Sequence, residues 1–217
     1  MRIIFSGLFL LTGIFYALAQ VPCGIINSYF EITSIDTCNN LMYSNTKGLS
    51  KGERVVIMQM KGASVNTGNN ASFGDITAMN SAGNYEFNVV SDVINDTGIV
   101  FSFKFRNTYQ AGMGLQLIRF PVYTKPVINC ALTCKAWDGV TGGVLVLFAT
   151  DTITLRAPVD VSKKGFRNVL PINAGNCLPL PYTDYFTTAV TKLGARKGEG
   201  VVVSSSAYEC GRGKLAN

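Results

Sequence analysis

Histidine is absent from all 217 residues, and only 15% of the residues are charged. Without an imidazole, neither a Ser–His–Asp triad nor a Cys–His pair can form, because both need it as the general base. The low charge, together with a hydrophobic fraction of 47%, argues for a packed fold and against a disordered chain.

Acid pairs of the kind used in glycoside hydrolysis remain open to a chain that lacks histidine. No spacing among the acids selects a pair, and solvated loop acids are the simpler interpretation. The candidate acids are Asp138, Asp151, Asp160, Asp184 and Glu199. We therefore expect a protein that is not an enzyme and that needs no cofactor.

Long hydrophobic runs are confined to the start of the chain. Met1 and Arg2 precede an almost unbroken apolar stretch, which ends in Ala17-Leu18-Ala19. The stretch is too short and wrongly flanked for a membrane-spanning helix, and the small residues at its end are typical of a signal-peptidase site. Residues 1–19 are therefore predicted to be a signal peptide, cut between Ala19 and Gln20. The mature protein is expected to be secreted or at the cell surface, with no membrane span.

Charge is divided unevenly along the mature chain. Residues 20–103 contain four Lys or Arg against seven Asp or Glu, and residues 104–217 contain fourteen against six. A basic half could meet an anionic partner. Its basic residues are scattered, however, and do not alternate with stacking aromatics as nucleic-acid interfaces require. We expect no nucleic-acid partner.

Cysteines occur in an even number, all of them after the predicted cut. They are Cys23, Cys38, Cys130, Cys134, Cys177 and Cys210. An even count in an exported chain favours disulfides, although six cysteines allow fifteen connectivities. Proximity in sequence favours the pairs 23–38, 130–134 and 177–210.

Metal sites find little support in the sequence. A zinc site is the rival interpretation of the cysteines, but the chain has neither histidine nor a CxxC pair. Asp75, Asp92 and Asp96 lie near turns without the spacing of a calcium loop. No metal ligand is predicted.

The mature sequence alternates between short apolar segments and turns. Tyr85, Phe87 and Val89 share one face of a predicted strand, and residues 99–105 repeat the pattern with Phe101, Phe103 and Phe105. Period-two alternation of this kind predicts half-buried strands. We expect an all-β protein, in which residues 20–140 form a β-sandwich or barrel-like domain.

Short β-branched segments follow residue 140. The continuous apolar segment 143–149 is expected to be a central strand. The segments after it are compatible with the start of a β-solenoid and equally with the second sheet of a sandwich. Residues 141–217 are thus predicted to be a β-rich continuation, and the chain is expected to be a truncated part of a larger protein.

Three aromatic residues are candidates for stacking on a sugar ring. Trp137, the only tryptophan, precedes the turn at Asp138-Gly139. Tyr182 and Tyr185 lie in a loop rich in proline and asparagine. An aromatic ring at such places more often packs against its own protein, so both interpretations stay open.

Six segments together resemble a known group of proteins. They are Val56–Ala63, Ala82–Asn88, Gln116–Tyr123, Trp137–Gly143, Asp160–Arg167 and Lys197–Gly200. In this order they resemble the N-terminal region of large exported, adhesin-like surface proteins of gliding Gram-negative bacteria, of the Bacteroidota and myxobacterial type. Such proteins are often labelled gliding-motility-associated, and many of the first group leave the cell by type IX secretion.

The resemblance brings no catalytic residue with it. It implies a non-catalytic, secreted or cell-surface structural and adhesion module of a larger protein. The alternative is a carbohydrate-binding module of a secreted polysaccharide-active system. The expected partners are accordingly surface glycans or other cell-surface proteins.

Overall fold

The fold was analysed in a computed structural model that describes residues 22–168, 184–188, 194–203 and 205–215. The signal segment with its Ala19–Gln20 cut, Cys177 and Tyr182 lie outside these residues. The described residues form strands and turns, with one short 3₁₀ helix, η2 (Ser206–Tyr208), and no α-helix. The prediction of an all-β protein is confirmed. No helix in these ranges has the length and apolar character needed to cross a membrane.

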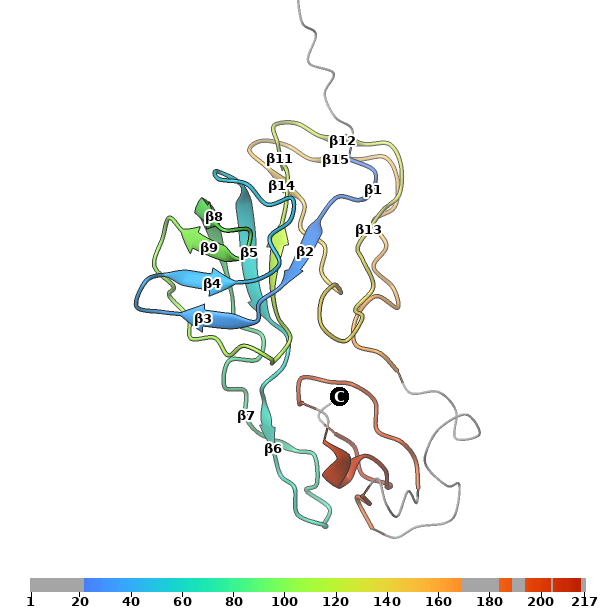
Figure 1. The fold of residues 1–217 in the computed structure, drawn as a ribbon. Coiled ribbons are helices and arrows are strands. Elements are labelled where there is room, and N and C mark those ends of the chain that lie inside the picture. The colour runs from blue at the N-terminus through green and yellow to red at the C-terminus, as the bar shows by residue number, and fades with distance from the viewer. Residues whose placement is uncertain (1–21, 169–183, 189–193, 204, 216–217) are drawn as a thin grey trace, which may run out of the picture.

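The largest element is a strongly curved sheet of seven antiparallel strands (Figure 1). Its order is β2 (Ser28–Glu31), β10 (Leu115–Arg119), β5 (Arg54–Gln59), β8 (Tyr85–Ile94), β9 (Gly98–Phe101), β4 (Leu41–Tyr43) and β3 (Ser34–Asp36). A register shift between Val90 and Asp92 bends β8 midway. Among the described strands the two edges, β2 and β3, do not pair with each other, so the sheet remains open.

The central strands β5 and β10 are buried on both faces. Val55, Ile57, Leu115 and Leu117 pack into the core on the concave side of the sheet. Val56, Ile118 and Phe120 form a second core on the convex side, where Val144, Val146 and Phe148 cover it. Burial on both faces explains why these strands are continuous apolar runs rather than alternating ones.

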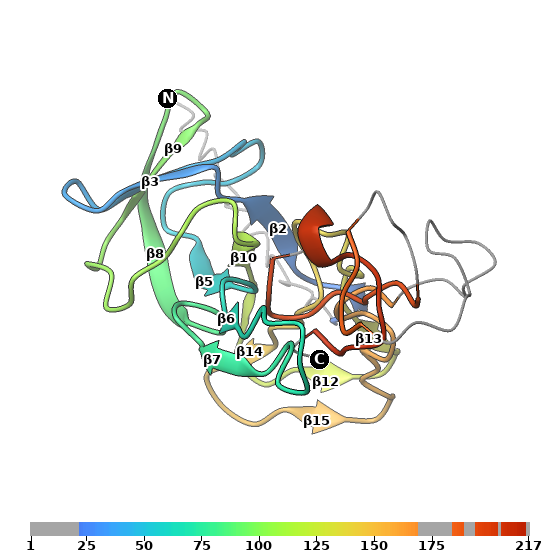
Figure 2. The same cartoon turned by 90° about the horizontal axis from the view of Figure 1, so that it is seen from below.

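Beyond the sheet, two successive turns of chain stack in parallel. β11 (Val122–Tyr123) pairs with β14 (Phe148–Ala149), and β12 (Val127–Ile128) pairs with β15 (Thr154–Leu155). A parallel bridge also joins Leu132 of β13 (Leu132–Thr133) to Val159. Paired residues are 26 or 27 positions apart, as in a solenoid turn. β1 (Gly24–Ile25) pairs with β13 on its other side, and the ladder joins residues on both sides of position 140 (Figure 2).

The expectation of a central strand over residues 143–149 is wrong, because only Phe148 and Ala149 pair as a strand. Side chains replace strand pairing for the rest of the segment. The Tyr29 hydroxyl donates to the carbonyl of Val144 at 2.6 Å. The Asn27 amide donates to the Val146 carbonyl and accepts from its N–H, both at 2.9 Å. The segment therefore covers the convex core without joining a sheet.

A third core lies at the lower end of the molecule in Figure 1. The hairpin β6 (Ser64–Val65) and β7 (Ile76–Ala78) lies beside the last described residues of the chain. Phe73 is its largest buried side chain, and it packs against Phe186 and Tyr208 at centroid distances of 5.3 and 6.1 Å.

Candidate functional site

On β8, the aromatic side chains point to solvent and the polar ones point inward. Tyr85 and Phe87 are 58% and 56% exposed, while Asn88 is buried and Glu86 is partly buried. The predicted period-two alternation is present, but its aromatic side chains form the exposed face. Large exposed aromatics on a regular strand are uncommon and often mark an interaction surface.

The inward polar side chains hold the segment that follows β9. Asn88 donates to the Phe103 carbonyl at 2.9 Å and accepts from the Phe103 N–H at 3.2 Å. The Glu86 carboxylate accepts from the N–H groups of Arg106 and Asn107 at 2.9 and 3.2 Å. The expected strand through Phe105 therefore ends at Phe101, and Phe103 is fixed on the surface with 62% of its area exposed.

These aromatics line a groove of about 340 Å³, here called the phenylalanine groove. Its lining residues are Arg54, Phe87, Asn88, Val89, Phe103, Phe120 and Phe148. The rings form a connected series. Phe87 meets the buried Phe120 edge to face at 5.8 Å, and Phe120 meets Phe148 at 5.7 Å. Tyr85 stands at the rim, 6.5 Å from Phe87.

Arg54 is the one charged residue that lines the phenylalanine groove. Its guanidinium lies 5.6 Å from the centre of the Phe148 ring, a cation–π contact. Arg54 forms no ion pair with any residue that the structure describes. The groove therefore combines an apolar floor with a cation that is open to a partner.

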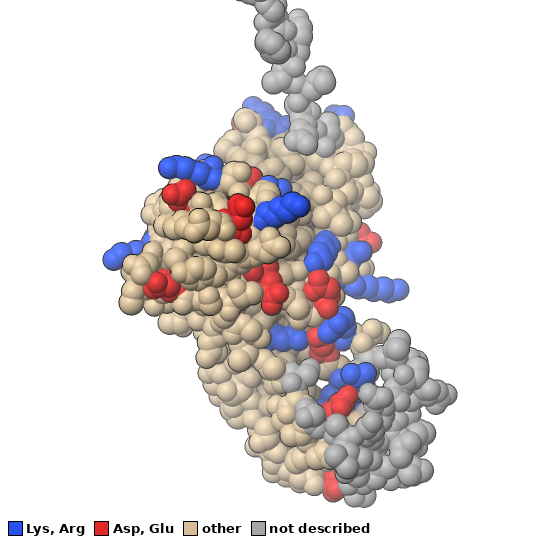
Figure 3. Space-filling view, viewed as in Figure 1, with Lys and Arg blue, Asp and Glu red and all other residues tan. Residues whose placement is uncertain are grey.

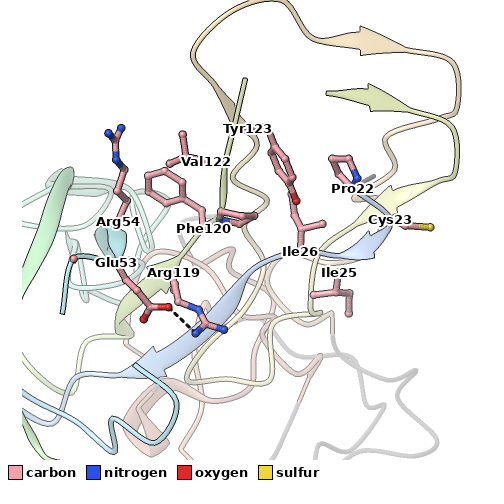
Figure 4. A pocket seen from close by; sticks show the side chains of 12 residues that line it. Pro22, Cys23, Ile25, Ile26, Glu53, Arg54, Arg119, Phe120, Val122 and Tyr123 are labelled. Atoms are coloured by element: carbon pink, nitrogen blue, oxygen red, sulfur yellow. Dashed lines mark hydrogen bonds and ion pairs between the residues drawn. The ribbon is translucent and has the colours of Figure 1, made fainter. Parts of the chain in front are cut away.

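A second cleft, of about 500 Å³, adjoins the groove and shares Arg54 and Phe120 with it. It lies between the start of β5, the connection from β10 to β11, and the N-terminal strand (Figure 4). Arg119 forms an ion pair with Glu53 at 3.0 Å on its floor and donates to Ser28 at 2.8 Å. Arg54 points away from this pair (Figure 4). Arg119 is thus neutralised, whereas Arg54 is not.

Trp137 does not form the exposed stacking platform that the sequence allowed. It is 3% exposed, and its ring packs edge to face against Phe166 at 5.8 Å. A Cβ atom built on Gly114 would lie 2.9 Å from the Trp137 ring, so this position needs glycine to let the ring approach. The Trp137 indole N–H is buried without a hydrogen-bond partner among the described residues.

Around Trp137 the charges are paired. Lys61 lies 5.6 Å from the Trp137 ring centre and forms an ion pair with Glu199 at 3.0 Å. Arg167 donates to the two oxygens of the same carboxylate, each at 2.9 Å. The hydrogen bonds from Arg167, followed by that from Lys61, lower the pKa of Glu199 to about 2. A carboxylate held ionised in this way is a poor general acid.

Tyr185 is partly buried in the third core, beside Phe73, where the Arg212 guanidinium lies 4.2 Å from its ring centre. The ring is therefore already covered on one face by the protein itself. Tyr182, the other tyrosine of this candidate platform, lies outside the described residues.

Three more of the candidate acids are also engaged locally. Asp138 is partly desolvated, which raises its pKa, but the Lys135 ammonium and two backbone N–H groups hold the pKa below its ordinary value. Asp151 forms an ion pair with Lys125, and Asp160 accepts from the Ser162 N–H. Of the calcium candidates, Asp75 forms an ion pair with Lys214. Within the described ranges no group of three or more acids or cysteines could hold a metal ion.

Two of the disulfides favoured by proximity are wrong. Cys23 is bonded to Cys130, with their Cα atoms 5.5 Å apart, although 107 positions separate them. Cys38 is free and exposed, and Cys134 is free and buried. The parallel pairing of β1 with β13 brings the distant cysteines together. Cys210 is disulfide-bonded, and the predicted 177–210 pair falls on Cys177, outside the described residues.

Charged side chains do not gather into a patch on the face seen in Figure 3, where acidic and basic residues are interspersed. The sequence prediction missed Arg54, Phe87 and Phe103, because strand alternation alone does not reveal which face is covered. No protein family, no curated protein and no solved structure matches the chain. Any function therefore has to be inferred from the geometry of the groove.

Proposed function

We propose that this chain is a non-catalytic, secreted or cell-surface module with a structural and adhesive role. The observation that carries the proposal is the phenylalanine groove with its exposed rings Phe87 and Phe103. Phe87 stands on a strand of the sheet whose opposite face is a packed core, and Phe103 is held in place by two hydrogen bonds with Asn88. Pre-positioned aromatics bind a partner at low entropic cost, and they dominate the energetics of many interfaces.

The export part of the proposal rests on two features. Residues 1–19 have the composition of a signal peptide. The Cys23–Cys130 disulfide agrees with an oxidising compartment, where such bonds persist. The resemblance to exported surface proteins of gliding bacteria supports the same location.

The non-catalytic part rests on the state of the acids. Glu199, Asp138 and Asp151 are each held by a cation. The sequence has no histidine that could serve as a base in their place. A binding role fits these residues better than acid–base chemistry.

Carbohydrate binding is the second candidate, and the exposed pair Tyr85 and Phe87 favours it. The two rings meet at the surface with centroids 6.5 Å apart. An exposed aromatic ring can stack on the apolar face of a sugar. The ligand would then be a surface glycan rather than a cell-surface protein.

An adhesion assay tests the main proposal. Beads coated with the mature chain should be retained under flow on bacterial cell envelopes. The double variant Tyr85→Ser, Phe87→Ser should reduce retention at least fivefold, because it removes the exposed rings. The matched control is Ile76→Ser, which removes another exposed apolar residue, from β7.

Two results would count against the proposal. If the wild type and the double variant were retained equally, the groove would have no role in adhesion. Release of reducing sugar from any polysaccharide by the pure protein would contradict the non-catalytic role.

A further inference from the structure

We infer that the phenylalanine groove binds an extended polypeptide segment of another protein, and this inference rests on the proposed binding function. The segment places a branched aliphatic or aromatic side chain among Phe87, Phe103 and Phe148. A neighbouring carboxylate of the segment pairs with Arg54.

The apolar part of the inference follows from the lining of the groove. Phe87 and Phe103 are more than half exposed, so a bound side chain would remove apolar area from water on both. The floor does not need to rearrange, because Phe120 is buried and packed between Phe87 and Phe148. An apolar pocket with fixed walls favours one compact side chain over a flat polar surface.

The acidic part follows from the charge of the groove. Arg54 is its only charged lining residue, and no described carboxylate neutralises it. The nearest candidate along the chain, Glu53, is already engaged by Arg119 at 3.0 Å. A partner carboxylate would gain a charge-assisted contact beside a ring system that excludes water.

The groove offers few hydrogen bonds to a sugar. Asn88 is the one amide side chain that lines the groove. Its oxygen accepts hydrogen bonds from the N–H groups of Val89 and Phe103, and its NH₂ group donates one to the Phe103 carbonyl. The other lining side chains, apart from Arg54, are apolar. A sugar would leave hydroxyl groups desolvated without partners, which is unfavourable. This favours a polypeptide over a glycan.

The partner must also approach the face of the sheet rather than its edge. Along the groove, residues 85–89 of β8 pair with β5 on one side. On the other side the carbonyls of Tyr85 and Val89 already accept hydrogen bonds from the Asn107 amide and the Ser102 N–H, which hinders the addition of a strand. Recognition has to come from side chains, as the Phe and Arg lining provides.

Two peptides that differ in one group test the inference on the mature chain. The acidic probe is acetyl-Gly-Leu-Phe-Asp-Gly-amide, and the neutral probe carries Asn in place of Asp. Titration followed by ¹H–¹⁵N NMR should show shifts on β8 and around Phe103. The acidic probe should bind at least fivefold more tightly than the neutral one.

Variants assign the preference to Arg54. In Arg54→Gln the two probes should bind equally. In Lys51→Gln, which removes an exposed positive charge three positions away, the fivefold ratio should persist. Phe87→Ser should weaken both probes by at least fivefold, and its unchanged backbone spectrum outside β8 would show that the fold is intact.

Each outcome decides the inference. Equal affinity of the two probes for the wild type, or shifts away from the groove, would overturn it. Binding of an oligoglucuronate instead of the peptides would also overturn it and favour a glycan ligand. If one of these results were obtained while the double variant Tyr85→Ser, Phe87→Ser still reduced bead retention, only the peptide inference would fail and the proposed adhesive function would remain supported. If the double variant were retained as well as the wild type in the bead assay, the proposed adhesive function itself would be contradicted.

Discussion

Among the sites that combine aromatic rings with a cation, the phenylalanine groove and the surroundings of Trp137 are in opposite states. In the phenylalanine groove, Phe87 and Phe103 are open to solvent and Arg54 has no described carboxylate partner. Around Trp137 the ring is covered, and Lys61 is paired with Glu199. We therefore propose that the same residue chemistry serves binding where the cation is unpaired and stabilises the fold where the cation is paired.

The closed site also ties distant parts of the chain together. Lys61 follows β5, Trp137 follows β13, and Glu199 belongs to the C-terminal part. Arg167 adds a fourth segment through its bonds to Glu199 and to the Asp138 carbonyl. Changes here should cost stability, and changes in the groove should not.

The largest effect is expected from Trp137→Ala. Removing a buried ring of this size leaves a cavity and should lower the free energy of unfolding by about 3–5 kcal/mol. Urea denaturation followed by circular dichroism measures it, since the variant has no tryptophan fluorescence. Tyr85→Ala is the exposed aromatic control. Similar stabilities for the two variants would show that Trp137 is not buried.

The next effect is expected from Glu199→Gln. Lys61 and Glu199 side chains are only 10% and 13% exposed, so neutralising the acid leaves a nearly buried ammonium without its counter-charge. We expect a loss of about 2 kcal/mol, less than for a fully broken buried pair, because the amide still accepts a hydrogen bond. Glu53→Gln, at the partly exposed pair with Arg119, should cost less than about 1 kcal/mol. A larger loss of stability in Glu53→Gln than in Glu199→Gln would contradict the assignment of the Lys61–Glu199 pair as the more important one for the fold.

A smaller, pH-dependent effect follows from the same carboxylate. The pKa of Glu199 is about 2 in the fold against an ordinary value of 4.5. The folded pKa is the lower one, so ionisation stabilises the fold above about pH 4.5. That contribution disappears as the pH falls from 4.5 to 2. Wild-type Tm should therefore fall more steeply than that of Glu199→Gln over this interval, and parallel curves would contradict the assignment.

Sequence patterns predicted elements better than they predicted contacts. The strand around Phe87 follows from its period-two alternation. Which face of β8 is covered depends on hydrogen bonds that Asn88 and Glu86 form with a segment 15 and 20 residues later, which no local pattern contains. Trp137 is the single tryptophan, yet its burial depends on Gly114, which leaves room for its ring. The Cys23–Cys130 bond likewise follows from strand pairing across the chain rather than from proximity in sequence.

The smallest effect on stability is expected in the groove itself. Phe87→Ser removes a side chain that is mostly exposed, so the free energy of unfolding should change by no more than about 0.5 kcal/mol. The fluorescence of added anilinonaphthalene sulfonate, an aromatic anion, should fall in this variant and in Arg54→Gln but not in Ile76→Ser. A loss above about 2 kcal/mol, a size typical of core truncation, would place Phe87 in the core. The contrast between the phenylalanine groove and the surroundings of Trp137 would then disappear, because the aromatic rings of both would stabilise the fold.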